Sequence, residues 1–247
     1  MPDLPDDVSE AIARITSPEP REEPDTGTGE LAALSEWWRG LVGATVVAPV
    51  REIFDPGRDI DAATALVSGV RAADRAVDSG ATLLVPRAGD RDDTASRALI
   101  ALLTKKEASA VLRQPPMMSD QEWMARCAAI RDLMAAHRDL LGDQVALLDA
   151  LGARSIAGMA GLLLGAAARR TPCLIDGTDE WAAALVADRL CHRARSWWRS
   201  ATTSPDPART AACDRVGVRQ GLPLQLDDED GVGATSTILL LELALEI

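Results

Sequence analysis

The residues best suited to chemistry in this 247-residue chain form an acidic run followed by a Gly-x-Gly motif near the C-terminus. The run Asp227-Asp-Glu-Asp-Gly-Val-Gly-Ala234 places four carboxylates before or beside two glycines, and apolar residues 235–247 predict a helix after it. Glycines at a helix start let backbone N–H groups approach an anion, and a nearby carboxylate is a candidate general base. Acidic turns before helices are also common surface structure, so the motif needs support from elsewhere.

Alternating strand and helix signals predict the scaffold that would position this loop. The predicted strands are residues 44–50, 81–85, 172–176 and 196–201, and the helices between them include residues 61–79, 94–104, 155–169 and 181–190. This order predicts an α/β fold with a parallel, Rossmann-like sheet covered by helices. Ligands bind at the carboxyl ends of such strands. We therefore expect Asp176-Gly177, residues 204–207 and the loop after residues 81–85 to lie near one another.

Two helices carry more specific signals. Ser119 and Glu122 form an S-x-x-E capping box that should open a long helix. Gly158, Gly161 and Gly165 are spaced along the helix predicted at residues 155–169. Because glycine weakens a helix, their use indicates close backbone packing, which we expect to be against the sheet.

The chain divides by composition into two parts. Residues 1–29 predict a short helix followed by an acidic, Pro-rich linker, and residues 30–247 predict a single α/β domain. The N- and C-terminal segments are expected to add a small helical part to that domain.

Charge and cysteine content exclude several classes of protein. The formal net charge of −12 repels phosphate backbones and anionic lipid, so neither nucleic acid nor a membrane is an expected partner. The four cysteines have no regular spacing, which favours buried, reduced thiols over a disulfide framework or a metal site. No signal peptide is evident, and the predicted location is cytoplasmic.

Four segments in a fixed order resemble one known family. They are Ala150-Leu-Gly-Ala-Arg-Ser-Ile-Ala-Gly-Met-Ala-Gly161, Pro172-Cys-Leu-Ile-Asp-Gly177, Ser204-Pro-Asp-Pro207 and Asp230-Gly-Val-Gly-Ala234. This pattern is similar to that of the nicotinate-nucleotide:dimethylbenzimidazole phosphoribosyltransferases, which assemble the nucleotide loop of cobalamin. The resemblance is specific in the last hundred or so residues and loose before them.

The resemblance implies a reaction and a set of site residues. A benzimidazole nitrogen would attack nicotinate mononucleotide at the ribose anomeric carbon, nicotinate would leave, and a carboxylate would take the benzimidazole proton. The family's catalytic glutamate falls on Asp230, with Glu229 as the fallback. The implied substrate-binding residues are Gly89, Thr94, Arg126, Asp176, Gly177, Ser204, Gly231 and Gly233. No cofactor or metal is implied, and the family tends to dimerise, so a homodimer or a heterodimer with a full-length homologue is expected.

The chain also departs from the family pattern. Asp230 is shorter than glutamate by about 1.5 Å, one C–C bond. The family's glycine loop falls on residues 86–94, where its acidic position becomes Arg87 and only Gly89 and Thr94 are kept. The glutamate of another family segment becomes Ser155. Between residues 44 and 61 a long family insert, which carries much of the benzimidazole pocket, is replaced by a short bridge.

Three functions therefore remain open at this level. The first is a shortened phosphoribosyltransferase with Asp230 as its base. The second is a non-catalytic paralogue that pairs with, or regulates, a full-length enzyme. The third is a nucleotide-binding module that keeps part of the nucleotide site.

Overall fold

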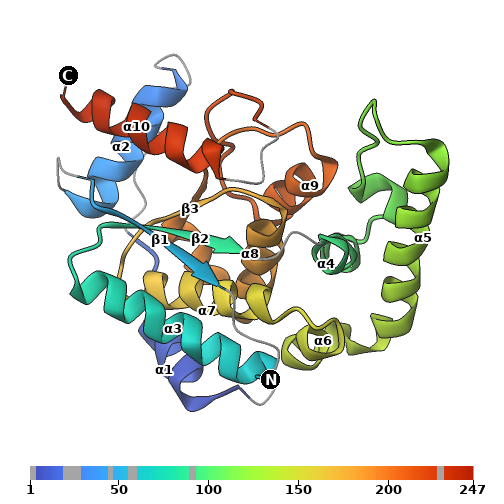
Figure 1. The fold of residues 1–247 in the computed structure, drawn as a ribbon. Coiled ribbons are helices and arrows are strands. Elements are labelled where there is room, and N and C mark those ends of the chain that lie inside the picture. The colour runs from blue at the N-terminus through green and yellow to red at the C-terminus, as the bar shows by residue number, and fades with distance from the viewer. Residues whose placement is uncertain are drawn as a thin grey trace.

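A four-stranded parallel sheet lies at the centre of the described part of the protein (Figure 1). The computed structural model describes residues 4–18, 29–43, 47–54, 60–88, 93–226 and 231–246. The strands β1 (Pro49–Phe54), β2 (Leu83–Ala88), β3 (Cys173–Ile175) and β4 (Trp198–Ser200) follow one another across the sheet in chain order. Pro49 pairs with Leu83, Leu84 with Cys173, and Cys173 with Trp198. The predicted parallel α/β sheet is confirmed.

Helices carry most of the remaining described chain. They are α1 (Asp6–Arg14), α2 (Glu30–Val42), α3 (Ala62–Asp78), α4 (Thr94–Thr104), α5 (Asp120–His137), α6 (Gln144–Ala150), α7 (Arg154–Ala168), α8 (Thr178–Leu190), α9 (Pro207–Val216) and α10 (Val232–Glu246), with the short 3-10 helices η2 (Ala108–Val111), η3 (Arg138–Gly142) and η4 (His192–Trp197). Ser119 accepts a hydrogen bond from the backbone N–H of Glu122 at 3.2 Å, so the predicted capping residue does begin α5.

The two faces of the sheet bury different helices because strand side chains alternate in direction. Leu83, Val85 and Leu174 pack in a cluster with residues of α2 and α10. Leu84 and Ile175 pack in the larger cluster that contains α3, α7 and α8. In Figure 1, α2 and α10 accordingly lie above the sheet and α3 and α7 below it. Helices α2 and α10 thus form the expected small helical part on one face of the sheet, whereas the N-terminal helix packs with α3 and α7.

Strand boundaries differ from the predicted ones. The first strand was predicted at residues 44–50, but β1 begins at Pro49. Residues 44–46 of the predicted strand lie outside the described part. Proline lacks an N–H group and cannot donate to a neighbouring strand. It is therefore tolerated at the first position of a strand, where Pro49 lies in β1. The predicted strand at residues 196–201 is shortened by η4, which occupies His192–Trp197 and leaves Trp198–Ser200 to pair with β3.

The glycines of α7 pack against a helix, which corrects the expectation that they face the sheet. A Cβ atom on Gly161 would overlap the carbonyl oxygen of Leu66 on α3, and a Cβ atom on Gly69 of α3 would overlap the carbonyl oxygen of Gly158. On Gly165 it would lie 2.8 Å from the Cβ of Ala73. Helices α3 and α7 therefore touch backbone to backbone, which side chains of any size would prevent.

Replacing Gly161 with alanine should lower the free energy of unfolding by about 2–4 kcal/mol, since backbone atoms of Leu66 cannot move aside as a side chain would. Urea denaturation measures the change. Gly142→Ala is the matched control, because a Cβ atom there meets nothing within 4 Å, and it should change stability by no more than about 1 kcal/mol. Equal urea midpoints for the two variants would contradict the close crossing of α3 and α7.

The N-terminal helix α1 lies on the main core. Val8 and Ala11 are fully buried in the same cluster as residues of α3 and α7. The acidic segment that follows, residues 19–28, lies outside the described part.

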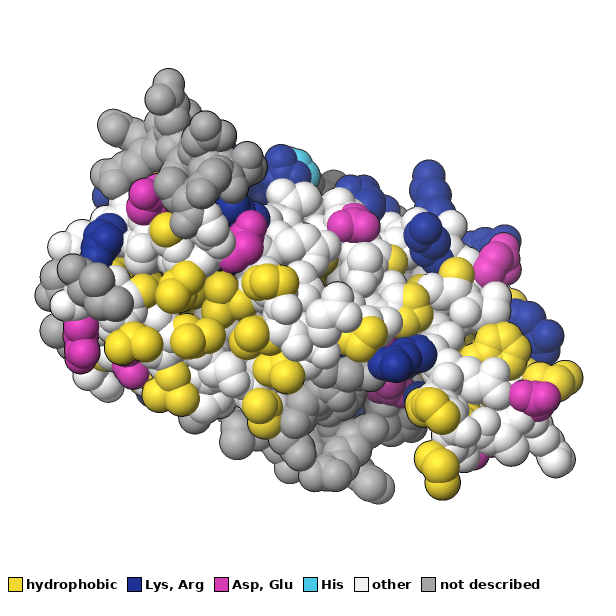
Figure 2. All heavy atoms as spheres, turned by 90° about the horizontal axis from the view of Figure 1, so that it is seen from above, with side chains coloured by type: hydrophobic (Ala, Val, Ile, Leu, Met, Phe, Trp, Pro, Cys, Tyr) yellow, Lys and Arg dark blue, Asp and Glu magenta, His cyan; other side chains and the backbone are white. Residues whose placement is uncertain are grey.

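Helix α10 exposes apolar side chains on its outer side. Leu239, Leu243 and Val232 are 60%, 53% and 43% exposed, and Figure 2 shows hydrophobic side chains gathered on the face that α2 and α10 form. Among the described helices, none combines the length and hydropathy needed to cross a membrane.

Candidate active site

The carboxylate that ends β3 caps the start of α10. Asp176 follows β3 directly and is buried, and its Oδ2 accepts a hydrogen bond from the backbone N–H of Ala234 at 2.8 Å. A Cβ atom on Gly233 would lie 2.6 Å from the same oxygen, so only glycine allows this approach. The positive end of the α10 dipole favours a carboxylate there. The anion that meets the N–H group of Ala234 is thus the protein's own Asp176.

The first glycine of the motif lies beside an arginine of β2. Gly231 has φ +75°, a conformation that favours glycine, and a Cβ atom on it would overlap the guanidinium group of Arg87. The start of α10 therefore lies against both β2 and the end of β3. The acidic residues 227–230 precede Gly231 and lie outside the described part.

A buried glutamate of α8 contacts the end of β2. Glu180, in the first turn of α8, is 6% exposed, and its Oε1 accepts a hydrogen bond from the N–H of Ala88 at 2.9 Å. Gly177 has φ +94°, and a Cβ atom on it would overlap Oε2 of Glu180. Burial, together with the charge of Asp179, raises the pKa of Glu180 to about 8, although the N–H of Ala88 and Arg87 act in the opposite direction. This carboxyl group is mostly neutral at pH 7.

A small hollow of about 10 Å³, room for about one water molecule, lies beyond the carboxyl ends of β3 and β4. Hydroxyl groups of Ser200, Thr202, Ser204 and Thr210 contribute to its lining, together with Asp176, Trp181, Arg209, Cys213 and Gln220. Arg209 is 3% exposed, lies 4.0 Å from Oδ1 of Asp176 and donates to the hydroxyl of Thr178 at 3.4 Å. Oγ1 of Thr202 is buried and has no hydrogen-bond partner among the described residues. The residues around the hollow combine a guanidinium group with hydroxyls, the types of group that bind phosphate and sugar oxygens.

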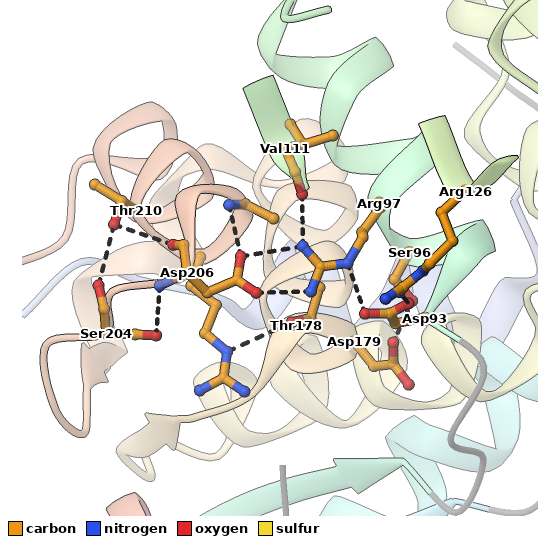
Figure 3. A network of polar contacts seen from close by, with 12 residues as sticks. Asp93, Ser96, Arg97, Val111, Arg126, Thr178, Asp179, Ser204, Asp206 and Thr210 are labelled. Atoms are coloured by element: carbon orange, nitrogen blue, oxygen red, sulfur yellow. Dashed lines mark hydrogen bonds and ion pairs between the residues drawn. The ribbon is translucent and has the colours of Figure 1, made fainter. Parts of the chain in front are cut away.

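A network of ion pairs connects α4 and α5 with the loop before α9, which carries Ser204 of the hollow (Figure 3). Arg97 of α4 binds both carboxylate oxygens of Asp206, at 3.2 and 2.6 Å, and its Nε donates to Asp93 at 2.6 Å. Its Nη1 also donates to the carbonyl oxygen of Val111 at 2.5 Å. Burial tends to lower the pKa of Arg97, but hydrogen bonds and charges from Asp206 and Asp93 outweigh it and raise that pKa.

The network also fixes the segment that follows β4. Asp206 caps α9 by accepting from the N–H of Ala208 at 2.8 Å, and its own N–H donates to Oγ of Ser204 at 3.1 Å. Arg97 therefore anchors the loop that presents Ser204 to the hollow. On the other side of the network, Arg126 of α5 donates to Asp93 at 2.6 Å.

Sequence comparison decides which family this site belongs to. A family model described as phosphoribosyltransferase matches residues 59–247. The nicotinate-nucleotide--dimethylbenzimidazole phosphoribosyltransferase of Mycobacterium leprae is 38% identical over 196 residues, 78% of this chain and 55% of that protein. The chain belongs to the nicotinate-nucleotide:dimethylbenzimidazole phosphoribosyltransferase family. The protein of the same name from Streptomyces avermitilis is 38% identical over 188 residues, 74% of this chain and 50% of that protein.

The chain spans about half the length of these curated relatives. Its fold is also that of solved family members. Two crystal structures from Thermus thermophilus, of CobT and of nicotinate-nucleotide-dimethylbenzimidazole phosphoribosyltransferase, superpose with TM-scores of 0.68 and 0.67 at 23% and 22% identity. Each match covers 97% of this chain, and 89% and 88% of the other chain.

The structure brings together several of the residues that the family resemblance implied. Asp176, Gly177, Gly231 and Gly233 meet where β3 ends and α10 begins, and Ser204 lines the hollow beside Asp176. Thr94 is the first residue of α4 and directly follows Asp93 of the ion-pair network. Arg126, on α5, takes part in that network through its bond to Asp93. The candidate base Asp230, its fallback Glu229, and Gly89 lie outside the described residues.

Three charged residues of the site were missed at the level of sequence. Arg97 directly precedes the apolar run Ala98–Leu103 of α4, and Glu180 directly precedes the apolar run of α8. A charge next to buried helix positions is the signal that could have found them, because an isolated buried charge requires a partner. Arg209, in α9, offers no such pattern.

The described residues contain no group of three His, Cys, Asp or Glu side chains in a metal-binding arrangement. Of the four free cysteines, Cys173, Cys191 and Cys213 are buried and Cys127 is half-buried. Burial raises the pKa of the Cys213 thiol to about 12 and that of Cys173 beyond its usual range, which disfavours a nucleophilic role for either.

Proposed function

We propose that this protein transfers the 5-phosphoribosyl group of nicotinate mononucleotide to a benzimidazole-type base. The observation that carries this proposal is the contact between Asp176 and Ala234, which joins two of the family's motif segments at the carboxyl end of the sheet. Family membership supports the same chemistry, since the relatives at 38% identity are named for it.

The side chains around the hollow beside Asp176 have the polar chemistry that binding a phosphoribosyl group requires. Arg209 supplies a positive charge in a chain of net charge −12, and hydroxyls such as those of Thr202 and Ser204 can pair with ribose or phosphate oxygens. Fixed donors of this kind hold the anomeric carbon in line with the attacking nitrogen. We assign Arg126 and Thr94 a supporting role in substrate binding at the α4 and α5 side.

In the proposed reaction, the nitrogen of the acceptor base forms a bond to the anomeric carbon while the bond from that carbon to nicotinate breaks. The electron pair of the broken bond leaves with nicotinate. Asp230 takes the proton from the second nitrogen of the acceptor. A general base of this kind contributes a rate factor of about 10²–10⁴.

Incubation with nicotinate mononucleotide and dimethylbenzimidazole, followed by chromatographic measurement of released nicotinate, tests the proposal. Asp230→Ala should lower the rate by about 10²–10⁴. Asp228→Ala in the same acidic run should leave the rate within about threefold of wild type, because the proposal gives Asp228 no role in the transition state. A folded Asp230→Ala protein that turns over at the wild-type rate would transfer the role of base to Glu229 or remove it from this loop.

Binding measured separately distinguishes the remaining functions. Calorimetry that detects nicotinate mononucleotide binding without turnover would support a nucleotide-binding module. Turnover only after addition of a full-length homologue would support a partner role. The homodimer or heterodimer stays a prediction, which light scattering of the purified protein measures, and so does the cytoplasmic location.

A further inference from the structure

We propose that Glu180 is a positioning residue of this site, which ties β2, the Gly177 turn and α8 together through a carboxyl group that must be uncharged for nucleotide to bind. This role rests on the proposed function and adds a residue that the family resemblance does not imply.

The contacts of Glu180 join the elements that carry the site. One carboxyl oxygen accepts from the N–H of Ala88, at the carboxyl end of β2, and the other packs on Gly177, which directly follows Asp176. Arg87, the residue before Ala88, lies against Gly231 at the start of α10. Glu180 thereby fixes the end of the strand that places Arg87 beside Gly231.

The charges around Glu180 explain why its protonation state should matter. Asp179 on α8 opposes ionisation and Arg87 on β2 favours it. At the end of β3, Asp176 is held by the N–H of Ala234 and lies 4.0 Å from Arg209. Ionisation of Glu180 would add a buried negative charge to a site that must accept a nucleotide phosphate, and it would draw Arg87 toward itself.

Nucleotide affinity should therefore fall as the pH rises through about 8. At about pH 9 roughly one tenth of the molecules would keep a neutral Glu180, so the apparent Kd for nicotinate mononucleotide should be about tenfold higher than at pH 7. Glu180→Gln keeps an acceptor for the N–H of Ala88 but cannot ionise, so its Kd should change less than about twofold over that range. Glu180→Ala should bind more weakly than Glu180→Gln at every pH, since it loses the contact with Ala88.

Calorimetric titration of wild type, Glu180→Gln and Glu180→Ala with nicotinate mononucleotide from about pH 6.5 to pH 9.5 is the test. A parallel rise of Kd in wild type and Glu180→Gln would overturn the role of Glu180 and leave the proposed function standing. No binding by any of the three proteins at any pH would overturn the proposed function itself.

A second measurement needs no variant. Infrared difference spectra of the wild-type protein should show the band of a protonated carboxyl group at pH 7 that is lost near pH 8. Absence of such a band at pH 7 would also overturn the role of Glu180, whether or not the variants fold.

Discussion

Arg97→Ala is expected to lower the free energy of unfolding by about 3–5 kcal/mol, because it removes one partner of a buried ion-pair network. The side chains of Arg97 and Asp206 are 6% and 5% exposed, and that of Asp93 is 13% exposed. Without Arg97, Asp206 keeps the cap of α9 as compensation, and Asp93 keeps Arg126. Two carboxylates would then remain in a low-dielectric environment with most of their hydrogen bonds lost.

Urea denaturation at pH 7 measures this effect, and two further variants sharpen it. Arg97→Lys should recover only part of the loss, since one ammonium group cannot reach Asp206, Asp93 and the carbonyl of Val111 as the guanidinium fork does. Arg131→Ala is the control: it breaks an exposed pair with Asp132, whose side chains are 69% and 71% exposed, and it should cost no more than about 0.5 kcal/mol. A loss below about 1 kcal/mol for Arg97→Ala would mean that the network contributes no more than a surface pair does.

Glu180→Gln should make the protein more stable at alkaline pH. The pKa of Glu180 rises from 4.5 in an exposed state to about 8 in the folded protein, mainly through burial. Between these two values the folded state holds one proton more than the unfolded state, so the free energy of unfolding falls as the pH rises. At about 1.4 kcal/mol per pKa unit, the decrease from pH 4.5 to pH 8 has an upper bound of roughly 5 kcal/mol. Glutamine cannot ionise and escapes this loss.

The difference in stability between Glu180→Gln and wild type should therefore grow from about pH 5 to pH 8 and level off above it. Urea denaturation at intervals of one pH unit measures it. The exposed Glu36 of α2 offers a matched control, because Glu36→Gln makes the same chemical change at the surface and should follow the wild-type curve. If the Glu180→Gln and wild-type curves stay parallel across this range, Glu180 does not carry its proton into the folded state.

Local signals predicted much of the fold correctly. The helix expected at residues 94–104 is α4, Thr94–Thr104, and Ser119 of the predicted capping box accepts from the N–H of Glu122 at the start of α5. The helix expected at residues 61–79 is α3, Ala62–Asp78. These features depend on apolar periodicity and on hydrogen bonds between residues three or four apart, both of which are visible in the sequence.

Strand ends and packing partners were predicted less well. A strand ends where its neighbour in the sheet ends, and β1 is paired with β2 through Phe54 and Ala88, which lie far apart in the chain. The glycines of α7 indicated a close approach, but Gly69 and Leu66 of α3, which lie about ninety residues earlier, decide that the neighbour is a helix.

The order of the four motif segments was enough to indicate the family, and the alternation of strand and helix signals was enough to indicate the parallel sheet and the cluster at its carboxyl end. Only the folded arrangement reveals how the Asp227–Ala234 loop is used at its described end: Gly233 lets Asp176 cap α10, and Gly231 makes room for Arg87. Only the fold, likewise, identifies Glu180 and Arg97 as buried. The charge state of a carboxyl group depends on the atoms that surround it in space, and those atoms come from segments that the sequence separates.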